Sequence, residues 1–505
     1  MARLRVQAVS YLRQFGRMNR NARLYLLSNT LNSITVGIFA LLYNLYLVAL
    51  GYQADFIGWL LVIGVAGGAL GMVTTSPLMA RLGTKATLFW SSVVAAAAGT
   101  LQLVIPQAFS LTITSFVLGV AGGIYLVIGA PLLADGSQAT ARSHIFSLNA
   151  ALALITAVIG QALGGYLPHL VSLPTISDSG LLRAIEPFLV SGAQARSYEL
   201  ALLLAGVIAA PSFLPIILMD PTPPRQPTAL PGQRAAKRAG AALAGARQRL
   251  SSRFQALKPP RLRTEALKAL RGPIGQLAMV EGLIGLGAGL FIPYFNLYFV
   301  QHLGVSTELY GLITAVSTAL MAVTTLAGPF FAARLGKVRA AVLGHLISLP
   351  FLAILGFTRA LPLVLAAYLV RGSLMNMAEP VLLSYFMSVV RPTERASANS
   401  AYNLGFWGCW AAGGALGGVI IAANNFTLPF VLAALIYLLA TALLWRCFKD
   451  RREVSADLSA DEPGLTPGSQ ALEEGPELHR PQEIDHHPGQ PQRGIAPVHT
   501  SFIED

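Results

Sequence analysis

The sequence predicts an all-α integral membrane protein with twelve transmembrane helices in two parallel six-helix pseudo-repeats. Of its 505 residues, 54% are apolar and 12% are charged, and its mean hydropathy is +0.59. This composition is too apolar for a chain surrounded by water. Apolar runs of about 20 residues, enough for a helix to cross a bilayer, recur along most of the chain. The chain also resembles itself at a shift of about 253 residues.

The apolar runs set the expected order of elements, because a helix in lipid must satisfy its own backbone groups. We expect spans at 24–49, 56–80, 86–106, 109–133, 145–170, 198–219, 274–301, 307–333, 338–358, 361–390, 396–422 and 426–447. The predicted domains are a basic N-terminus (1–23), a six-helix bundle (24–219), a basic central loop (220–272), a second bundle (273–447) and an acidic tail (448–505).

The distribution of basic residues predicts the orientation in the membrane. The first 23 residues carry six Arg and no acidic residue, and the run that follows is too long for a signal peptide, so we expect an uncleaved first helix. The connections on the same side as the N-terminus are rich in Arg and Lys, whereas those on the other side hold only Arg183, Arg196 and Arg359. This asymmetry places both termini in the cytoplasm, with the protein in the cell membrane.

Several classes of function are not supported by the sequence. The net charge is +13, but the basic residues lie between the apolar runs and are not gathered on one folded face, so we expect no nucleic acid partner. Cys409 and Cys447 lie in or beside apolar runs and suit packing, not a disulfide framework or a metal cluster. The chain has no Walker A loop, no HExxH pair and no convincing nucleophile and base. We therefore expect no enzyme activity, no metal and no cofactor.

Three segments outside the spans have separate expectations. In the central loop, Leu243, Leu250, Phe254 and Leu257 share one face among basic residues, which favours a helix on the lipid surface over a solvated linker. The connection 171–197 holds a segment, 181–190, that suits either a short surface helix or an ordinary loop. The tail is rich in Pro, Gly and acid and should be disordered, and its four His suit solvated residues better than metal ligands.

The internal repeat divides the chain into two homologous halves. Asn44-Leu45-Tyr46 matches Asn296-Leu297-Tyr298, and the register continues to Gly58 with Gly311, Arg142 with Arg395 and Gly164-Gly165 with Gly417-Gly418. Six spans per half give both halves the same orientation, so the repeats are parallel and a solute site is expected between them. This arrangement favours transport by alternating access.

Two loop segments carry a family resemblance. Arg81-Leu82-Gly83-Thr84-Lys85 and Arg334-Leu335-Gly336-Lys337-Val338-Arg339 resemble the basic loop motif of the major facilitator superfamily. The resemblance covers about residues 20–447 and implies the major facilitator fold, with gating roles for Arg81, Gly83, Lys85, Arg334, Gly336 and Lys337. Ala80 and Ala333 stand where the family has an acid, so the charge relay of the motif is weakened or absent. Anchoring by positive charge is the alternative reading of these residues.

Glycine-rich segments in spans five and eleven extend the resemblance. Gly160-Gln161-Ala162-Leu163-Gly164-Gly165 is similar to the antiporter signature of the superfamily, with Gln161 in place of proline, and Gly413 to Gly418 stands in register. The segment 371–380 resembles span ten of uncharacterised bacterial and drug-efflux-like facilitators. These similarities favour export. Tight helix packing explains the same glycines: Gly160, Gly164, Gly165, Gly413, Gly417 and Gly418.

Three charged residues lie deep in predicted spans, where charge is costly and often functional. Glu281 lies in span seven, and Arg371 and Glu379 lie in span ten, separated by about 12 Å along the helix. The resemblance places spans one, four, seven and ten around a central cavity. Glu281 and Glu379 suit proton carriers there, because two carboxylates in one partly dry cavity repel when both are charged. Arg371 suits an anionic substrate, and a static interhelical ion pair is the alternative for all three.

Other polar residues in the spans are candidates for contact with a solute: Asn32, Asn44, Tyr46, Tyr125, Tyr294, Asn296 and Tyr298. Interhelical hydrogen bonding is the alternative role for each. Asn29 on span one is a further cavity candidate, and Asn149 on span five suits gating or stacking, with packing as the favoured role. Pro293 removes a backbone hydrogen bond, so we expect a kink in span seven.

Together these features predict a secondary transporter that exports a small organic solute by proton-coupled alternating access. Its expected partners are membrane lipids, the solute and protons, and we expect it to act as a monomer. Two alternatives stay open: a facilitator that imports sugars or organic anions, and a membrane sensor that kept the fold without transport.

Overall fold

The computed structural model describes residues 18–135, 142–174, 186–221, 272–390 and 395–451. These residues belong to one compact unit, Met1–Ser455. They are helical and contain no strand within the described ranges. The predicted all-α fold is thereby confirmed. The lipid-surface helix expected at 243–257, the expected disorder of the tail and its histidines, and residues 1–17 of the basic N-terminus lie outside the described residues.

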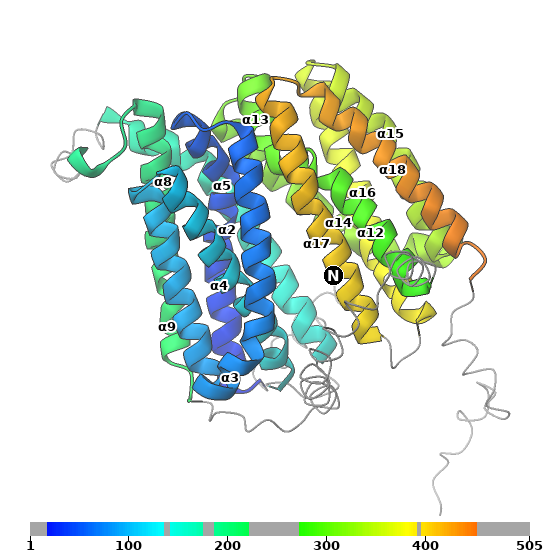
Figure 1. The fold of residues 1–505 in the computed structure, drawn as a ribbon, viewed down its shortest axis with the longest axis horizontal. Coiled ribbons are helices and arrows are strands. Elements are labelled where there is room, and N and C mark those ends of the chain that lie inside the picture. The colour runs from blue at the N-terminus through cyan, green and yellow to red at the C-terminus, as the bar shows by residue number, and fades with distance from the viewer. Residues whose placement is uncertain (1–17, 136–141, 175–185, 222–271, 391–394, 452–505) are drawn as a thin grey trace, which may run out of the picture. The chain divides into compact units, whose positions relative to one another are not determined.

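The helices follow the predicted spans closely (Figure 1). Those of the first half are α2 (Arg20–Ala49), α3 (Ala54–Val104), α4 (Ala108–Asp135), α5 (Arg142–Ser172), α8 (Ala193–Ala209) and α9 (Phe213–Ile217). Those of the second half are α12 (Pro273–Gly289), α13 (Phe295–Leu297), α14 (Thr307–Leu335), α15 (Lys337–Phe357), α16 (Leu361–Val389), α17 (Arg395–Ala422) and α18 (Thr427–Phe448). Single 3-10 turns lie at Glu186–Phe188, Ala210–Ser212 and Ile292–Tyr294.

Helix α3 contains two membrane spans joined at a glycine. It has 51 residues, and Gly83 within it has φ 80° and ψ 163°. This backbone conformation is open almost exclusively to glycine and turns the chain back. Eleven described helical segments are long and apolar enough to cross a membrane, and α3 counts as two spans, which gives the predicted twelve. Gly336, between α14 and α15, has nearly the same conformation, with φ 84° and ψ 148°.

Span seven is interrupted at the predicted proline. Helix α12 ends at Gly289, a 3-10 turn contains Pro293, and after α13 the segment Tyr298–His302 forms a π-helix. Proline lacks an N–H and its ring crowds the preceding turn, which breaks the regular hydrogen-bond pattern. The equivalent helix of the first half, α2, is continuous through 30 residues.

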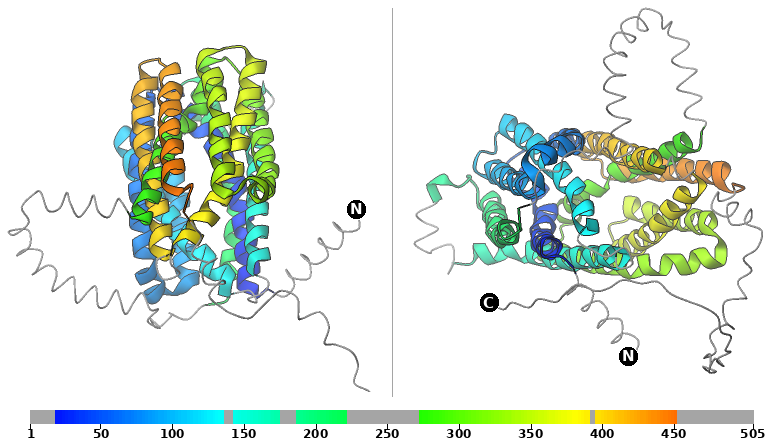
Figure 2. Two further views of the ribbon diagram at one scale, coloured as in Figure 1. Left: turned by 90° about the vertical axis from the view of Figure 1, so that its right-hand side faces the viewer. Right: turned by 90° about the horizontal axis from the view of Figure 1, so that it is seen from below.

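The two ends of the helices are named here after one residue each. The Gly51 end contains the turns at Gly51, Pro106, Gly192, Gly304, Thr358 and Asn424. The Asn19 end contains Asn19, Gly83, Gly272 and Gly336. Within the first half, α2 packs on α5 and α8; within the second, α12 packs on α17 and α18 in the equivalent arrangement. Figure 2 shows these helices from two further directions.

The halves meet mainly through two helix pairs, α3 with α17 and α5 with α14, and α2 also contacts α13. A large buried apolar cluster contains residues of both halves, among them Leu42, Leu45, Leu290 and Phe299. A smaller cluster lies toward the Asn19 end, and its buried members, such as Tyr25 and Leu88, all belong to the first half. The apolar core therefore joins the halves most extensively toward the Gly51 end.

Many large apolar side chains lie on the surface. Phe109 is 79% exposed, Val73 is 75% exposed and Phe357 is 72% exposed. A water-soluble protein rarely exposes so much apolar surface, whereas the hydrocarbon core of a bilayer covers it without cost. The surface thus agrees with a multi-pass membrane protein.

Candidate functional site

Three polar residues from three helices lie at a similar depth in the second half. Glu281 on α12, Glu379 on α16 and Tyr402 on α17 are each about 10 to 15 Å along their helix from the Asn19 end, at 1.5 Å per residue. The hydroxyl of Tyr402 is a hydrogen-bond partner of the Glu281 carboxyl, and the charge of Glu379 acts on Glu281. We call Glu281, Glu379 and Tyr402 the acidic cluster.

The two carboxyl groups of the acidic cluster differ in exposure. Glu281 is only 3% exposed, whereas Glu379 is exposed on the helix surface. A buried carboxylate is stable only when it is protonated or well paired. The cluster thus combines a shielded carboxyl group with one that is exposed in this conformation. Tyr402 was not among the residues predicted from sequence.

The internal repeat contains a neutral counterpart of this contact. At the repeat shift, Asn29 corresponds to Glu281 and Asn149 corresponds to Tyr402. In the first half the Asn29 amide donates to Asn149 Oδ1 at 2.9 Å. The same pair of positions, on spans one and five or seven and eleven, therefore holds a hydrogen bond in both halves, and only the second half has an ionisable group in it. This register is the signal that identifies Tyr402.

Arg371 lies inside the second half, away from the carboxyl groups. Its guanidinium carbon is 4.6 Å from the ring centre of Phe291 and 5.4 Å from that of Tyr437. The residue is 4% exposed, and its Nε and Nη2 atoms have no hydrogen-bond partner in the structure. Cation–π contact with two rings replaces part of the solvation that the charge has lost. The contact of Arg371 with an anionic solute stays a prediction.

The two asparagines predicted to face the solute form hydrogen bonds between the halves. Asn44 Nδ2 donates to the carbonyl of Pro293 at 2.7 Å, and Asn296 Nδ2 donates to the carbonyl of Leu41 at 3.2 Å. Both bonds lie toward the Gly51 end. In this conformation both amides serve the interface between the halves.

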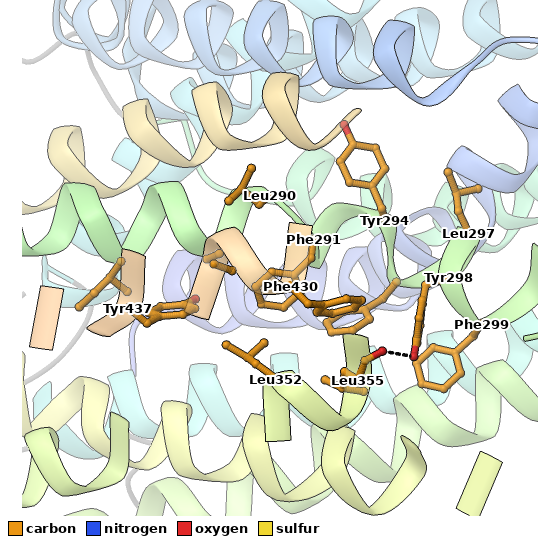
Figure 3. Packing of buried hydrophobic residues seen from close by; sticks show 14 of the residues in the cluster. Leu290, Phe291, Tyr294, Leu297, Tyr298, Phe299, Leu352, Leu355, Phe430 and Tyr437 are labelled. Carbon is orange, nitrogen blue, oxygen red and sulfur yellow. Dashed lines mark hydrogen bonds between the residues drawn. The ribbon is translucent and has the colours of Figure 1, made fainter. Parts of the chain in front are cut away.

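Tyr46 and Tyr298 are buried, and their hydroxyl groups are bonded to the backbone. Tyr46 donates to Leu103 at 3.0 Å, and its repeat equivalent Tyr298 donates to Leu355 at 2.6 Å (Figure 3). Each bond stays within one half and anchors the first helix of the half to its third.

Tyr294 makes a different contact from the other tyrosines. It points away from the aromatic cluster shown in Figure 3 and donates to the carbonyl of Gly414 on α17 at 2.6 Å. Tyr125 packs against Tyr25, with ring centres 5.7 Å apart, and Asn32 is half-buried on α2. Contact of Tyr46, Tyr125, Tyr294, Tyr298 and Asn32 with a solute stays a prediction.

The two loops with the predicted gating residues lie at the Asn19 end. Lys85 Nζ donates to the carbonyl of Met219 at 2.6 Å, which ties the start of span three to the end of span six. The Arg334 guanidinium lies 4.4 Å from the ring centre of Phe330, one turn earlier on α14. Arg81 is exposed, and Lys337 is half-buried. Lys85 thus joins two helices of the first half in this conformation, and the gating role of these loops stays a prediction.

The glycine segments of α5 and α17 lie against neighbouring backbones. A Cβ atom on Gly160 or Gly164 would meet Ile34 or Ile38 of α2, and one on Gly413 or Gly417 would meet Leu286 or Leu290. The last glycine of each segment contacts the opposite half instead. A Cβ on Gly165 would lie 2.8 Å from the Thr307 carbonyl oxygen, and one on Gly418 would meet that of Ala54.

Gln161, which replaces the proline of the resembled signature, also reaches the other half. Its Oε1 atom accepts a hydrogen bond of 2.9 Å from Thr318 on α14. The described residues include no group of three His, Cys, Asp or Glu placed to hold a metal ion.

Comparisons with known proteins agree with this architecture. The sequence model of the Major Facilitator Superfamily matches residues 25–273 and 277–491. No curated protein matches the chain in sequence. Among solved structures, the nucleoside transporter NupG is 13% identical, with a TM-score of 0.63, and the match covers 85% of this chain and 100% of NupG.

Two further solved structures have similar folds. A bacterial homologue of the human lysosomal transporter Spinster, in an inward-facing and occupied conformation, is 13% identical with a TM-score of 0.65, and the match covers 86% of this chain and 98% of that one. The inward-open xylose transporter XylE from E. coli is also 13% identical, with a TM-score of 0.58 and coverage of 86% and 98%.

Proposed function

Because the chain belongs to the Major Facilitator Superfamily, and is thus a secondary transporter and not an enzyme, we propose that it exports a small organic solute in exchange for protons. The proposal takes the two bundles, 24–219 and 273–447, as the parts that alternate around a central site. It places the protein in the cell membrane as a monomer, with the Asn19 end in the cytoplasm, as the distribution of Arg and Lys favours.

The observation that carries proton coupling is the acidic cluster. Glu281 is shielded and hydrogen-bonded, Glu379 is exposed, and the two charges interact. A proton entering at Glu379 therefore changes the electrostatic cost of charge on Glu281. Such coupling between an exposed and a shielded carboxyl group supports exchange of a proton for a solute.

The positions of the hydrogen bonds between the halves support an inward-facing conformation. The described hydrogen bonds that cross between the halves lie on the Gly51 side of the bundle, at Asn44, Asn296, Tyr294 and Gln161. With the Asn19 end in the cytoplasm, the closed end faces outward. The acidic cluster then lies on the cytoplasmic side of the closed region.

Inside-out vesicles with an imposed proton gradient and a pH-sensitive dye test the proposal. We expect some members of a panel of cationic, anionic and neutral solutes to release protons, and Glu281→Gln or Glu379→Gln to abolish the response. Asp450→Asn, in an 84% exposed side chain outside the spans, serves as the control with wild-type flux. Saturable inward flux without proton movement would favour a facilitator, and binding without flux would favour a sensor.

A further inference from the structure

Asn44 and Asn296 occupy equivalent positions in the two halves, and each bonds to the other's helix. The register is complete, because Leu41 and Pro293, the two acceptors, are also equivalent at the repeat shift of the matched segments. Asn44 reaches Pro293 at 2.7 Å and Asn296 reaches Leu41 at 3.2 Å. The pair of bonds thus follows the two-fold relation between the halves.

The break in span seven makes one of these acceptors available. In a regular helix the carbonyl of Pro293 would accept the N–H of Leu297. Here the N–H of Leu297 instead meets Oδ1 of Asn296 at 2.9 Å. The Asn296 side chain therefore accepts the N–H of Leu297 with Oδ1 and donates from Nδ2 to the Leu41 carbonyl on α2. The Pro293 carbonyl is left to receive Asn44.

Water competes little with the bond of Asn296, which is buried, and the bond of Asn44 is half-buried. Asn296 is 2% exposed, and Leu41, Leu42 and Leu297 beside it are buried. A buried amide that loses its acceptor, and a buried carbonyl that loses its donor, both pay a desolvation cost. The two bonds therefore favour the closed Gly51 end over states in which its two helices separate without new partners.

From these contacts we infer that Asn44 and Asn296 form a reciprocal clasp that holds the Gly51 end closed and sets the balance between the two conformations of the transport cycle. The inference rests on the alternating access proposed above, but not on protons or on the direction of transport. When the clasp opens, the two amides become free, and the predicted contact of Asn44 and Asn296 with a solute belongs to that state.

The test measures the separation of the halves at the Gly51 end directly. Cys409 and Cys447 are replaced by Ser, and nitroxide labels are attached at Phe109→Cys and Phe357→Cys, two exposed positions at this end, one in each half. Pulsed electron resonance then gives the distance distribution in lipid nanodiscs, without solute or proton gradient. Failure of the transport proposal would leave this measurement unaffected.

The variants are Asn44→Leu and Asn296→Leu, which keep the branched shape of the side chain but remove the donor. We expect each to raise the ratio of open to closed molecules by about five- to tenfold, the effect of one lost hydrogen bond. The matched control is Tyr52→Phe, which also removes one donor at this end, but within a single half, where Tyr52 bonds to the Pro106 carbonyl at 2.7 Å. It should leave the ratio within about twofold of that in the labelled parent.

An unchanged ratio in both asparagine variants would overturn the clasp, and so would an equal shift in Tyr52→Phe, since that would indicate general loosening. If the leucine variants do not fold, Asn44→Ala and Asn296→Ala remove the same donors without added bulk. The ratio of open to closed molecules decides the outcome for the alanine variants too.

Discussion

Gly165 and Gly418 occupy equivalent positions in the two repeats, and each lies against the first residues of a helix in the opposite half. Gly165 meets α14 near Thr307, and Gly418 meets α3 near Ala54. The two contacts form equivalent seams on either side of the interface. Neither has room for a side chain, so both seams depend on the absence of a Cβ atom.

Gly418→Ala should open the seam between α3 and α17. The added methyl group would meet the Ala54 carbonyl and the Tyr294 hydroxyl, so we expect a loss of stability of about 1–3 kcal/mol from overpacking. Thermal unfolding in detergent measures it. Gly408→Ala, on the same helix but with open space at its Cβ, is the control and should be neutral or slightly stabilising. Equal melting temperatures for the two variants would contradict the seam.

Gly83→Ala and Gly336→Ala should each destabilise the protein through backbone strain. Both glycines have a positive φ, 80° at Gly83 and 84° at Gly336, and Gly336 has no atom within 4 Å of an added Cβ. We expect a loss of about 1–3 kcal/mol at each position. Gly99→Ala, in a regular part of α3 with open space, provides the comparison and should not lower the unfolding temperature.

Asn21→Ala should cost more stability than Arg20→Ala, although both residues contact Asp220. Asn21 donates to the Asp220 carbonyl at 3.2 Å and accepts its N–H at 2.8 Å, which ties the start of α2 to the end of span six. Two lost bonds predict about 1–3 kcal/mol. The Arg20–Asp220 ion pair is 58% and 56% exposed, so its loss should cost less than about 1 kcal/mol. A larger effect of Arg20→Ala in urea unfolding would reverse this ranking.

Pro293→Ala should raise the helical order of span seven and slow transport. The new N–H can complete a regular helix, and the rotated segment would then lose the bond from Tyr294 to Gly414. We expect a several-fold lower flux without a drop in unfolding temperature. Pro350→Ala, inside α15, tests a proline that lies in a single uninterrupted helix. If both variants transport at the wild-type rate, the break at Pro293 has no role in the cycle.

The spans were predictable because each is defined by a long apolar run that needs no partner to be recognised. The prediction from 307 to 333, for example, differs from α14 by two residues at one end. The break at Pro293 was also predictable, because a proline removes an N–H from any helix. The equivalence of residues in the two halves followed from comparing the sequence with itself.

Side-chain roles were harder to predict, because they depend on which helices meet. Tyr402 resembles any tyrosine in an apolar run until α17 places it beside Glu281. Arg371 lies in the predicted span, but its stacking on Phe291 and Tyr437 depends on packing inside the second half. Asn44 and Asn296 were recognised as a repeated pair, yet their bonds to each other's helices require the two halves in contact.

The neutral pair Asn29 and Asn149 gives the acidic cluster a reference within the same molecule. A duplication gives both copies the same contact. One copy can then keep the helix packing while the other gains ionisable side chains. Here the first copy preserves the geometry without an ionisable group. The two versions of the contact differ at both of their positions, Asn29 against Glu281 and Asn149 against Tyr402, while the helices that carry them are arranged alike.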